Sequence, residues 1–382
     1  MSALLIRRNS PLAWIRVRLM PSGAAGPRLV AGRVLAELLP GLPVSGVPLY
    51  RRLALLGSVL NVEADGQGMV AHITAEPDRI VPTLEALSSA LHVTLPAGSL
   101  AEARSEAEAT WQWERNDSEA LADLLADLAL HTPPVQWSNL AGTLTAAMEG
   151  STPDWSSPAA VGELSATYVG PHDADAEALL HELVTQQATP AHPFQESAPA
   201  ASHAHTKLDV VSDGSTLIRL GWHAPRRDHD DFPALAIAAR IVGGHHRAWL
   251  TQEFRTERGW AYSPWSLLRS GPTHGLWQVS LRVPHAHVKE AVDRTRTLIR
   301  TCAPTLAEHH AATAHARTEI LQLCSAGDTQ VSLLGYWQEL GIDPRQEKER
   351  WLTALAATTP EDVARAVGRW LDAAPHIALS LG

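Results

Sequence analysis

The chain has 382 residues but few cysteines, few phenylalanines and no surplus of positive charge. Its two cysteines, Cys302 and Cys324, are too few for a disulfide framework, and both lie in helical-looking sequence, so we expect buried thiols. The net charge is −10, and the basic residues, nearly all arginine, form no run. Because a general nucleic-acid-binding surface needs clustered Lys and Arg, the composition argues against that class of protein.

Long apolar stretches are also missing, and none reaches membrane-spanning length. Residues 1–23 contain neither a continuous apolar segment nor a small-residue cleavage site, so we predict no signal peptide there. The 45% hydrophobic and 19% charged residues are typical of globular proteins. We therefore expect a soluble, cytoplasmic protein with two domains of roughly 150 to 200 residues each.

What the chain does contain is one order of elements that occurs twice. Residues 1–190 predict a strand, a helix, a hairpin, a helix and a strand, and residues 206–382 repeat this order. Residues 191–205 are rich in Ala, Pro, Ser and His and are typical of a linker. We predict an α+β fold with two homologous halves related by pseudo-two-fold duplication. Each half is a mainly antiparallel β-sheet with helices packed on one face.

Helix ends are marked clearly in the second half. Gly243 and Gly244 follow an apolar helical segment and predict its end. Thr359 as N-cap, Pro360 at the first helical position and Asp362 three residues after the cap predict the start of the last helix.

Several segments resemble one known family. In "DDFPALAIAARIVGGHHRAWLTQEFRTERGWAYSPWS", a helix ends in Gly-Gly, a second helix carries Leu and Arg, and Gly-x-Ala-Tyr-Ser follows. This pattern resembles the mitochondrial-processing-peptidase-like, or pitrilysin-type, metallopeptidases. "LALLGSVLNVEA", "ATYVGPHDADAEALLHEL" and "TTPEDVARAVGRWL" are similar to further parts of that family, in the same order. The resemblance thus covers nearly the whole chain.

Active members of this family carry an H-x-x-E-H motif, in which two histidines on one helix face bind zinc and the glutamate activates water. By the resemblance, its three positions fall in "VAGRVLAELLPG" and are Arg33, Ala36 and Glu37. A distant glutamate ligand of the family corresponds to Glu106. None of the 19 histidines forms this motif or H-E-x-x-H. We expect no metal in this chain and zinc in a partner subunit instead.

The family also has an arginine and a tyrosine, seven residues apart, that hydrogen-bond the substrate near the scissile bond. Arg255 and Tyr262 have this spacing. A guanidinium with fixed donors and a phenol on a rigid ring can polarise a carbonyl and stabilise an oxyanion. The structural alternative is that Arg255 pairs with Glu253 or Glu257 and that Tyr262 is packed in a strand. Arg258 does not fit the spacing and is expected on the surface.

Tryptophan is abundant, with 13 residues against three phenylalanines. Trp260 and Trp265 flank Tyr262, and we expect them to share its strand face if the strand is regular. They would form an aromatic wall for peptide side chains, or contacts at a partner interface, where Trp is enriched. Ordinary core packing is the alternative.

A chain without the zinc motif but with the Arg–Tyr pair resembles the non-catalytic subunit of the heterodimeric bacterial branch of this family. The resemblance implies a zinc-bearing homologous partner, a peptide substrate held between the two, and no activity alone. Leader-peptide removal or peptide maturation is an expectation by analogy. Two alternatives stay open: a catalytically inert scaffold or peptide-binding protein of the same fold, and an active metalloenzyme with an unrecognised site. We expect neither a nucleic-acid nor a membrane partner.

Overall fold

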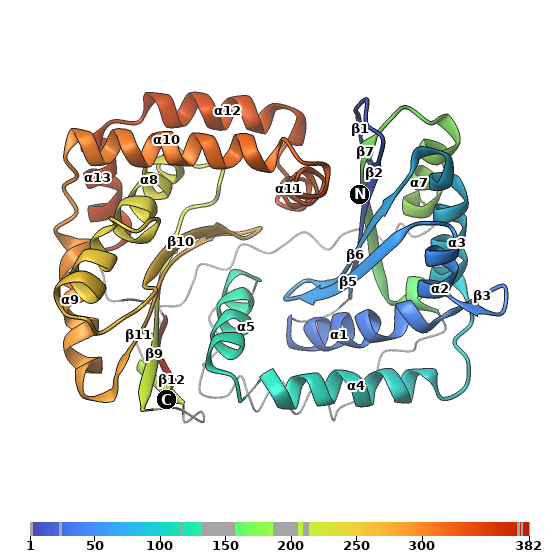
Figure 1. Cartoon of the computed structure of the whole chain (residues 1–382), viewed down its shortest axis with the longest axis horizontal. Coiled ribbons are helices and arrows are strands. Elements are labelled where there is room, and N and C mark those ends of the chain that lie inside the picture. The colour runs from blue at the N-terminus through green and yellow to red at the C-terminus, as the bar shows by residue number, and fades with distance from the viewer. Residues whose placement is uncertain are drawn as a thin grey trace. The chain divides into compact units, whose positions relative to one another are not determined.

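The computed structural model describes residues 3–22, 25–114, 116–131, 157–185, 205–208, 214–372, 375 and 377–381. The chain divides into two compact units, each with a five-stranded sheet (Figure 1). Neither unit is continuous in sequence. Unit 1 comprises Met1–Gln112, Asn139–Pro193 and Leu323–Glu339, and unit 2 comprises Trp113–Ser138, Phe194–Gln322 and Leu340–Gly382.

The sheet of unit 1 has the strand order β1-β7-β2-β6-β5. Strands β1 and β7 are parallel, and every other pair is antiparallel. The strands are β1 (Leu4–Arg7), β2 (Ala13–Pro21), β5 (Val59–Asp65), β6 (Gly68–Ala75) and β7 (Gly162–Gly170). The unit also contains α1 (Ala25–Gly41), α2 (Leu49–Leu55), α3 (Ile80–His92), α4 (Ser99–Glu114), α7 (Ala174–Thr185) and the short strands β3 (Pro43–Val44) and β4 (Val47–Pro48).

Alternation along β2 places its apolar side chains on one face of this sheet. Ile15, Val17 and Leu19 are fully buried there and belong to one apolar core with residues of α1 and α3, among them Leu35 and Leu87. Burial of this apolar face is what holds the helices on the sheet.

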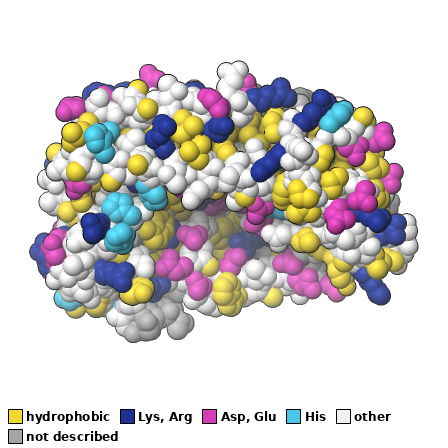
Figure 2. All heavy atoms as spheres, turned by 45° about the horizontal axis from the view of Figure 1, so that its top comes forward, with side chains coloured by type: hydrophobic (Ala, Val, Ile, Leu, Met, Phe, Trp, Pro, Cys, Tyr) yellow, Lys and Arg dark blue, Asp and Glu magenta, His cyan; other side chains and the backbone are white. Residues whose placement is uncertain are grey.

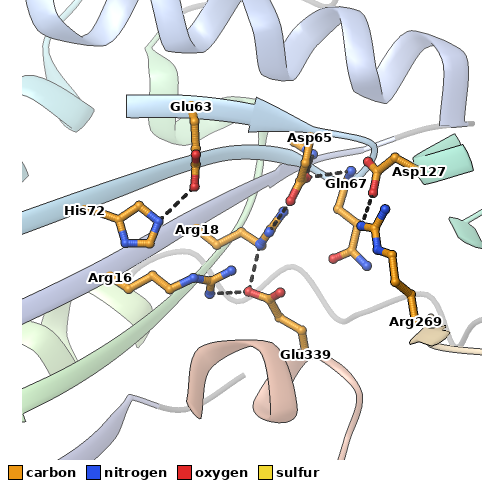
Figure 3. A network of polar contacts seen from close by, with 10 residues as sticks. Arg16, Arg18, Glu63, Asp65, Gln67, His72, Asp127, Arg269 and Glu339 are labelled. Carbon is orange, nitrogen blue, oxygen red and sulfur yellow. Dashed lines mark hydrogen bonds and ion pairs between the residues drawn. The ribbon is translucent and has the colours of Figure 1, made fainter. Parts of the chain in front are cut away.

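The opposite face of β2 carries Arg16 and Arg18, and helix α11 (Gly327–Glu339) covers it. Both guanidinium groups donate to the carboxylate of Glu339, and Arg18 also donates to Asp65 at 2.7 Å (Figure 3). Burial alone would lower the pKa of Arg18, but the charges of Glu339 and Asp65 outweigh burial and raise that pKa. The buried cluster therefore stays charged and satisfied by hydrogen bonds.

The sheet of unit 2 has the order β10-β11-β9-β12-β8. Its strands β12 and β8 are parallel and the other pairs are antiparallel, so the topology of unit 1 is repeated. The strands are β8 (His205–Leu208), β9 (Ser215–Ala224), β10 (Trp265–Ser270), β11 (Gly275–Pro284) and β12 (Ile377–Leu381). The α-helices are α5 (Ser118–His131), α8 (Phe232–Gly243), α9 (Val288–Arg300), α10 (Leu306–Leu323), α12 (Pro344–Ala357) and α13 (Pro360–Trp370).

Helix α5 has the same relation to the second sheet that α11 has to the first. Arg219 of β9 is buried and donates to Asp123 at 2.8 Å and to Glu119 at 3.4 Å. Arg269 of β10 donates to Asp127 at 2.7 Å. Each sheet therefore presents arginines to the acidic side chains of one helix that comes from the other half of the sequence.

The predicted fold class is confirmed, since both sheets are mainly antiparallel and carry helices. The prediction placed helices on one face of each sheet. The structure has one more helix on the opposite face, α11 in unit 1 and α5 in unit 2. The end of α8 at Gly243 and the capping box formed by Thr359 and Asp362 are as expected. Of the predicted linker 191–205, only His205, the first residue of β8, lies among the described residues.

The charged surface is mixed. On the face drawn in Figure 2, acidic and basic side chains are interspersed rather than segregated by sign. No helix of the described residues combines the length and the apolar character that crossing a bilayer requires.

The two thiols differ in their surroundings. Cys302 is buried, and burial, together with the charge of Glu308, raises the pKa of its thiol to about 12, whereas Cys324 is only half-buried. Since the thiolate is the reactive form, Cys302 stays protonated and unreactive below that pH. We expect iodoacetamide at pH 8 to modify Cys324 well before Cys302 in the native protein, and both equally after denaturation. Peptide mass spectrometry measures this, and equal labelling of the native protein would contradict it.

Candidate functional site

The segment before Tyr262 is a π-helix, η4 (Thr251–Glu257). The carbonyl of Phe254 accepts hydrogen bonds from the N–H groups of Trp260 at 2.8 Å and Ala261 at 3.0 Å. Gly259 follows with a φ of +65°, a left-handed conformation that glycine adopts without steric cost. The sequence predicted an ordinary helix ending at this glycine. The wider π-type turn is uncommon and is frequent at functional sites.

Two buried side chains fix the direction of their neighbours in this turn. Phe254 is 0% exposed and Ala261 is 4% exposed, so both anchor the backbone in the core. Arg255 and Tyr262, the next residues along the chain, are exposed, and Tyr262 is exposed by 78%. The guanidinium carbon of Arg255 lies 4.5 Å from the centroid of the Tyr262 ring. The two residues predicted from their spacing therefore form one exposed cation–π pair.

Glu253, one of the two acidic residues that the structural alternative pairs with Arg255, binds two other arginines. Glu253 accepts from Arg258 at 2.7 Å and from Arg294 at 3.1 Å. Within the described part of the chain, Arg255 forms no salt bridge. The expectation that Arg258 lies on the surface is wrong: its side chain is 26% exposed and lies 4.8 Å above the Trp260 ring. Arg258 therefore supports the turn.

The predicted strand around Tyr262 begins later than expected. Strand β10 starts at Trp265, so Trp260 and Tyr262 precede it in an irregular segment. The prediction that Trp260 and Trp265 share a strand face with Tyr262 is wrong for this reason. Proline at 264, which removes a backbone donor, sits immediately before the strand.

Trp260, Tyr262 and Trp265 nevertheless line one groove in unit 2. It has a volume of about 530 Å³ and joins the segment after η4 to the ends of two neighbouring strands. Its lining consists of Trp260, Tyr262, Ser263 and Trp265, with Gly214, Ser215 and Leu217 at β9, Ser280, Leu281, Arg282, Val283 and Pro284 at β11, and Glu119 of α5.

The two charged lining residues, Glu119 and Arg282, are among those that were not predicted from the sequence. Their charged atoms lie 3.6 Å apart, and the Arg282 guanidinium also donates to the hydroxyl of Ser118 at 2.6 Å. Glu119 lies in the first half of the sequence, in a helix that packs on the second sheet. No local pattern in the sequence could have placed it beside Tyr262.

The degenerate zinc positions lie on α1 in unit 1. Arg33 is half-buried, and its guanidinium carbon lies 5.9 Å from the ring centroid of Trp111. Ala36 is half-buried and offers no metal donor. Glu37 and Glu106, the position matched to the family's distant ligand, line one cavity of about 320 Å³.

These residues do not fit a zinc ion. Zinc sites of this type use imidazole donors, and none of the three motif positions supplies one. Arg33 and Glu37 are four residues apart, so a permanent cation lies on the helix face where a metal would bind. Across the described residues, no group of three or more His, Cys, Asp or Glu side chains is placed to hold a metal ion.

Known proteins are similar to part of this sequence and to its whole fold. Residues 166–308 match the family described as peptidase M16 inactive domain. A search of curated protein sequences gives no significant match.

Several solved structures have a similar fold over the entire length of this chain. The peptidase M16 inactive domain from Pseudomonas fluorescens is 19% identical, with a TM-score of 0.77, and covers 100% of this chain and 95% of its own. A protease from Helicobacter pylori is 13% identical, with a TM-score of 0.77 and coverage of 100% and 96%. A chain of complex III2 from Candida albicans, with Inz-5 bound, is 14% identical, with a TM-score of 0.73 and coverage of 100% and 93%. At these identities the structures establish the fold. In sequence, the similarity to the peptidase M16 inactive domain covers residues 166–308.

Proposed function

We propose that this chain is the substrate-positioning, non-catalytic subunit of a heterodimeric zinc metallopeptidase that acts on peptides. The observation that carries the proposal is the exposed pair of Arg255 and Tyr262 on a π-helix. Neither side chain is accounted for by packing, and Arg255 has no salt bridge within the described residues. A homologous partner would supply the zinc, because Arg33, Ala36 and Glu37 cannot.

The chemistry of the pair suits this role. Arg255 offers several N–H donors in a fixed plane and keeps its charge at any working pH. Tyr262 adds one O–H donor on a rigid ring. Directed at a peptide carbonyl near the scissile bond, these donors would hold the backbone and stabilise negative charge that develops on the oxygen. The proposed setting is the bacterial cytoplasm, and peptide maturation or leader removal is the proposed process.

The second candidate is an inert scaffold or peptide-binding protein of the same fold. It shares the fold and the missing zinc motif with the first candidate, but it gives Arg255 and Tyr262 no role in catalysis. The two candidates therefore predict the same partner binding and different kinetics.

The test combines this chain with a homologous subunit that carries H-x-x-E-H, such as one encoded in the neighbouring reading frame. We expect the two to co-elute in size-exclusion chromatography and to cleave peptides only when combined. Metal analysis of this chain alone should find less than stoichiometric zinc. Stoichiometric zinc in the isolated chain would overturn the proposal in favour of an unrecognised metal site, and an inactive complex with wild-type assembly would favour the scaffold.

A further inference from the structure

The two tryptophan rings of the groove beside Tyr262 are each fixed by contacts with neighbouring side chains. Trp260 is stacked on His287, with ring centroids 4.1 Å apart and planes 5° apart. Arg258 lies over the Trp260 ring at 4.8 Å and is itself fixed by Glu253 at 2.7 Å. An aromatic ring fixed in this way offers a preformed contact surface, which lowers the entropy cost of binding.

The second aromatic wall is supported by a different arginine. The guanidinium carbon of Arg219 lies 4.6 Å from the Trp265 ring centroid. Arg219 is almost fully buried and is fixed by Asp123 at 2.8 Å. Both tryptophans of the groove thus stack on arginines that are held in ion pairs, although the supporting residues come from different elements.

The charges of the residues that line the groove sum to zero. Of its lining residues only Glu119 and Arg282 are charged, and they lie 3.6 Å from each other. A charged side chain entering the groove would lose hydration, and the two charges of the lining already neutralise each other. An aromatic or large aliphatic side chain would instead bury apolar surface against the two rings.

Tyr262 belongs both to the groove and to the proposed substrate clamp. Its ring lines the groove and also contacts Arg255 at 4.5 Å. A peptide whose backbone is held by Arg255 and Tyr262 therefore has a neighbouring side chain within reach of the groove.

We propose that this groove determines the sequence preference of the complex by taking one uncharged aromatic or large aliphatic side chain of the peptide, against Trp260 and Trp265. The occupant lies next to the backbone that Arg255 and Tyr262 hold. This inference rests on the proposed function for the complex, the peptide and the backbone clamp, and it adds the class of side chain that is recognised.

The test uses the full chain without its partner and ten-residue peptides that differ only at one central position: Phe, Leu, Ala, Asp or Lys. Affinities are measured by fluorescence anisotropy with an N-terminal dye. We expect the Phe and Leu peptides to bind about 10-fold or more tighter than the Ala peptide, and the Asp and Lys peptides no tighter than Ala. Equal affinity for all five peptides, or no binding of any, would overturn the proposal.

Variants then assign the preference to the groove. Trp260→Ala and Trp265→Ala should bring the Phe-to-Ala affinity ratio close to one. Trp113→Ala is the matched control, because Trp113 is 67% exposed and lies outside the groove lining, and it should leave the ratio unchanged. A wild-type ratio in both groove variants would contradict the assignment.

Two further measurements keep the test decisive if an alanine variant misfolds. In the unmodified chain labelled with 5-fluorotryptophan, the ¹⁹F signals lost in Trp260→Phe and Trp265→Phe identify the two residues. The Phe peptide should shift both signals and the Lys peptide neither; unshifted signals at saturation would exclude the groove. Arg255→Ala should weaken all five peptides but keep their ratio. If the wild-type chain shows the Phe-to-Ala affinity ratio but its heterodimer cleaves no peptide, the proposed function is refuted and the groove proposal is not.

Discussion

Arg255→Ala is expected to lower kcat of the heterodimer by about 100-fold or more, the usual effect of removing one donor to a developing oxyanion. Arg255 forms no salt bridge within the described part of the chain, and it is exposed, so its removal costs the fold little. Kinetics with a peptide substrate, after assembly is checked by size-exclusion chromatography, measures the change. Tyr262→Phe tests the phenol separately, since it removes the O–H donor and keeps the ring that Arg255 contacts.

The matched control is Arg300→Ala. Arg300 is also an exposed arginine of unit 2, but it pairs with Asp372 at 3.1 Å and does not line the groove. It should leave both kcat and KM unchanged. If Arg255→Ala and Tyr262→Phe assemble normally and cleave at the wild-type rate, the pair has no part in catalysis and the scaffold is the better description.

Glu339→Ala should have the largest effect on stability, lowering the free energy of unfolding by about 3–5 kcal/mol. Glu339 is 6% exposed and accepts from Arg16 and Arg18, each 5% exposed. Without it, two buried guanidinium groups lose a common partner, and only Asp65 remains for Arg18. Urea unfolding followed by circular dichroism measures the change.

The control for this prediction is Asp372→Ala, which breaks the Arg300–Asp372 pair on the surface. Those side chains are 58% and 64% exposed, so water already screens their attraction, and the expected loss is below about 1 kcal/mol. Similar losses in the two variants would mean that the Arg16–Arg18–Glu339 cluster contributes no more than an exposed pair.

The elements most readily predicted from the sequence were those with local signals. The capping box at Thr359, the helix end at Gly243 and the hairpin of β5 and β6 depend on residues a few positions apart. The spacing of Arg255 and Tyr262 could be read in the same way, although their contribution to function stays a prediction. Such features follow from short-range hydrogen bonding and side-chain alternation.

The rest depended on contacts between distant residues. Around the π-type turn both Phe254 and Ala261 are buried, a pattern that no helical periodicity reveals. The support of Trp265 by Arg219 and the placing of Glu119 in the groove both depend on α5 packing on the second sheet. Sequence patterns describe which face of an element is apolar but not which distant element covers it.

The position of α11 late in the sequence affects how the first sheet folds during synthesis on the ribosome. The strands β2 and β6 are synthesised long before the helix that neutralises Arg16 and Arg18, which begins at Gly327. At the usual rates of protein synthesis, these arginines remain without Glu339 for a time on the order of tens of seconds. The first sheet therefore completes its native ion pairs only after Glu339 has been synthesised. A nascent chain halted before residue 327 would have one face of that sheet uncovered.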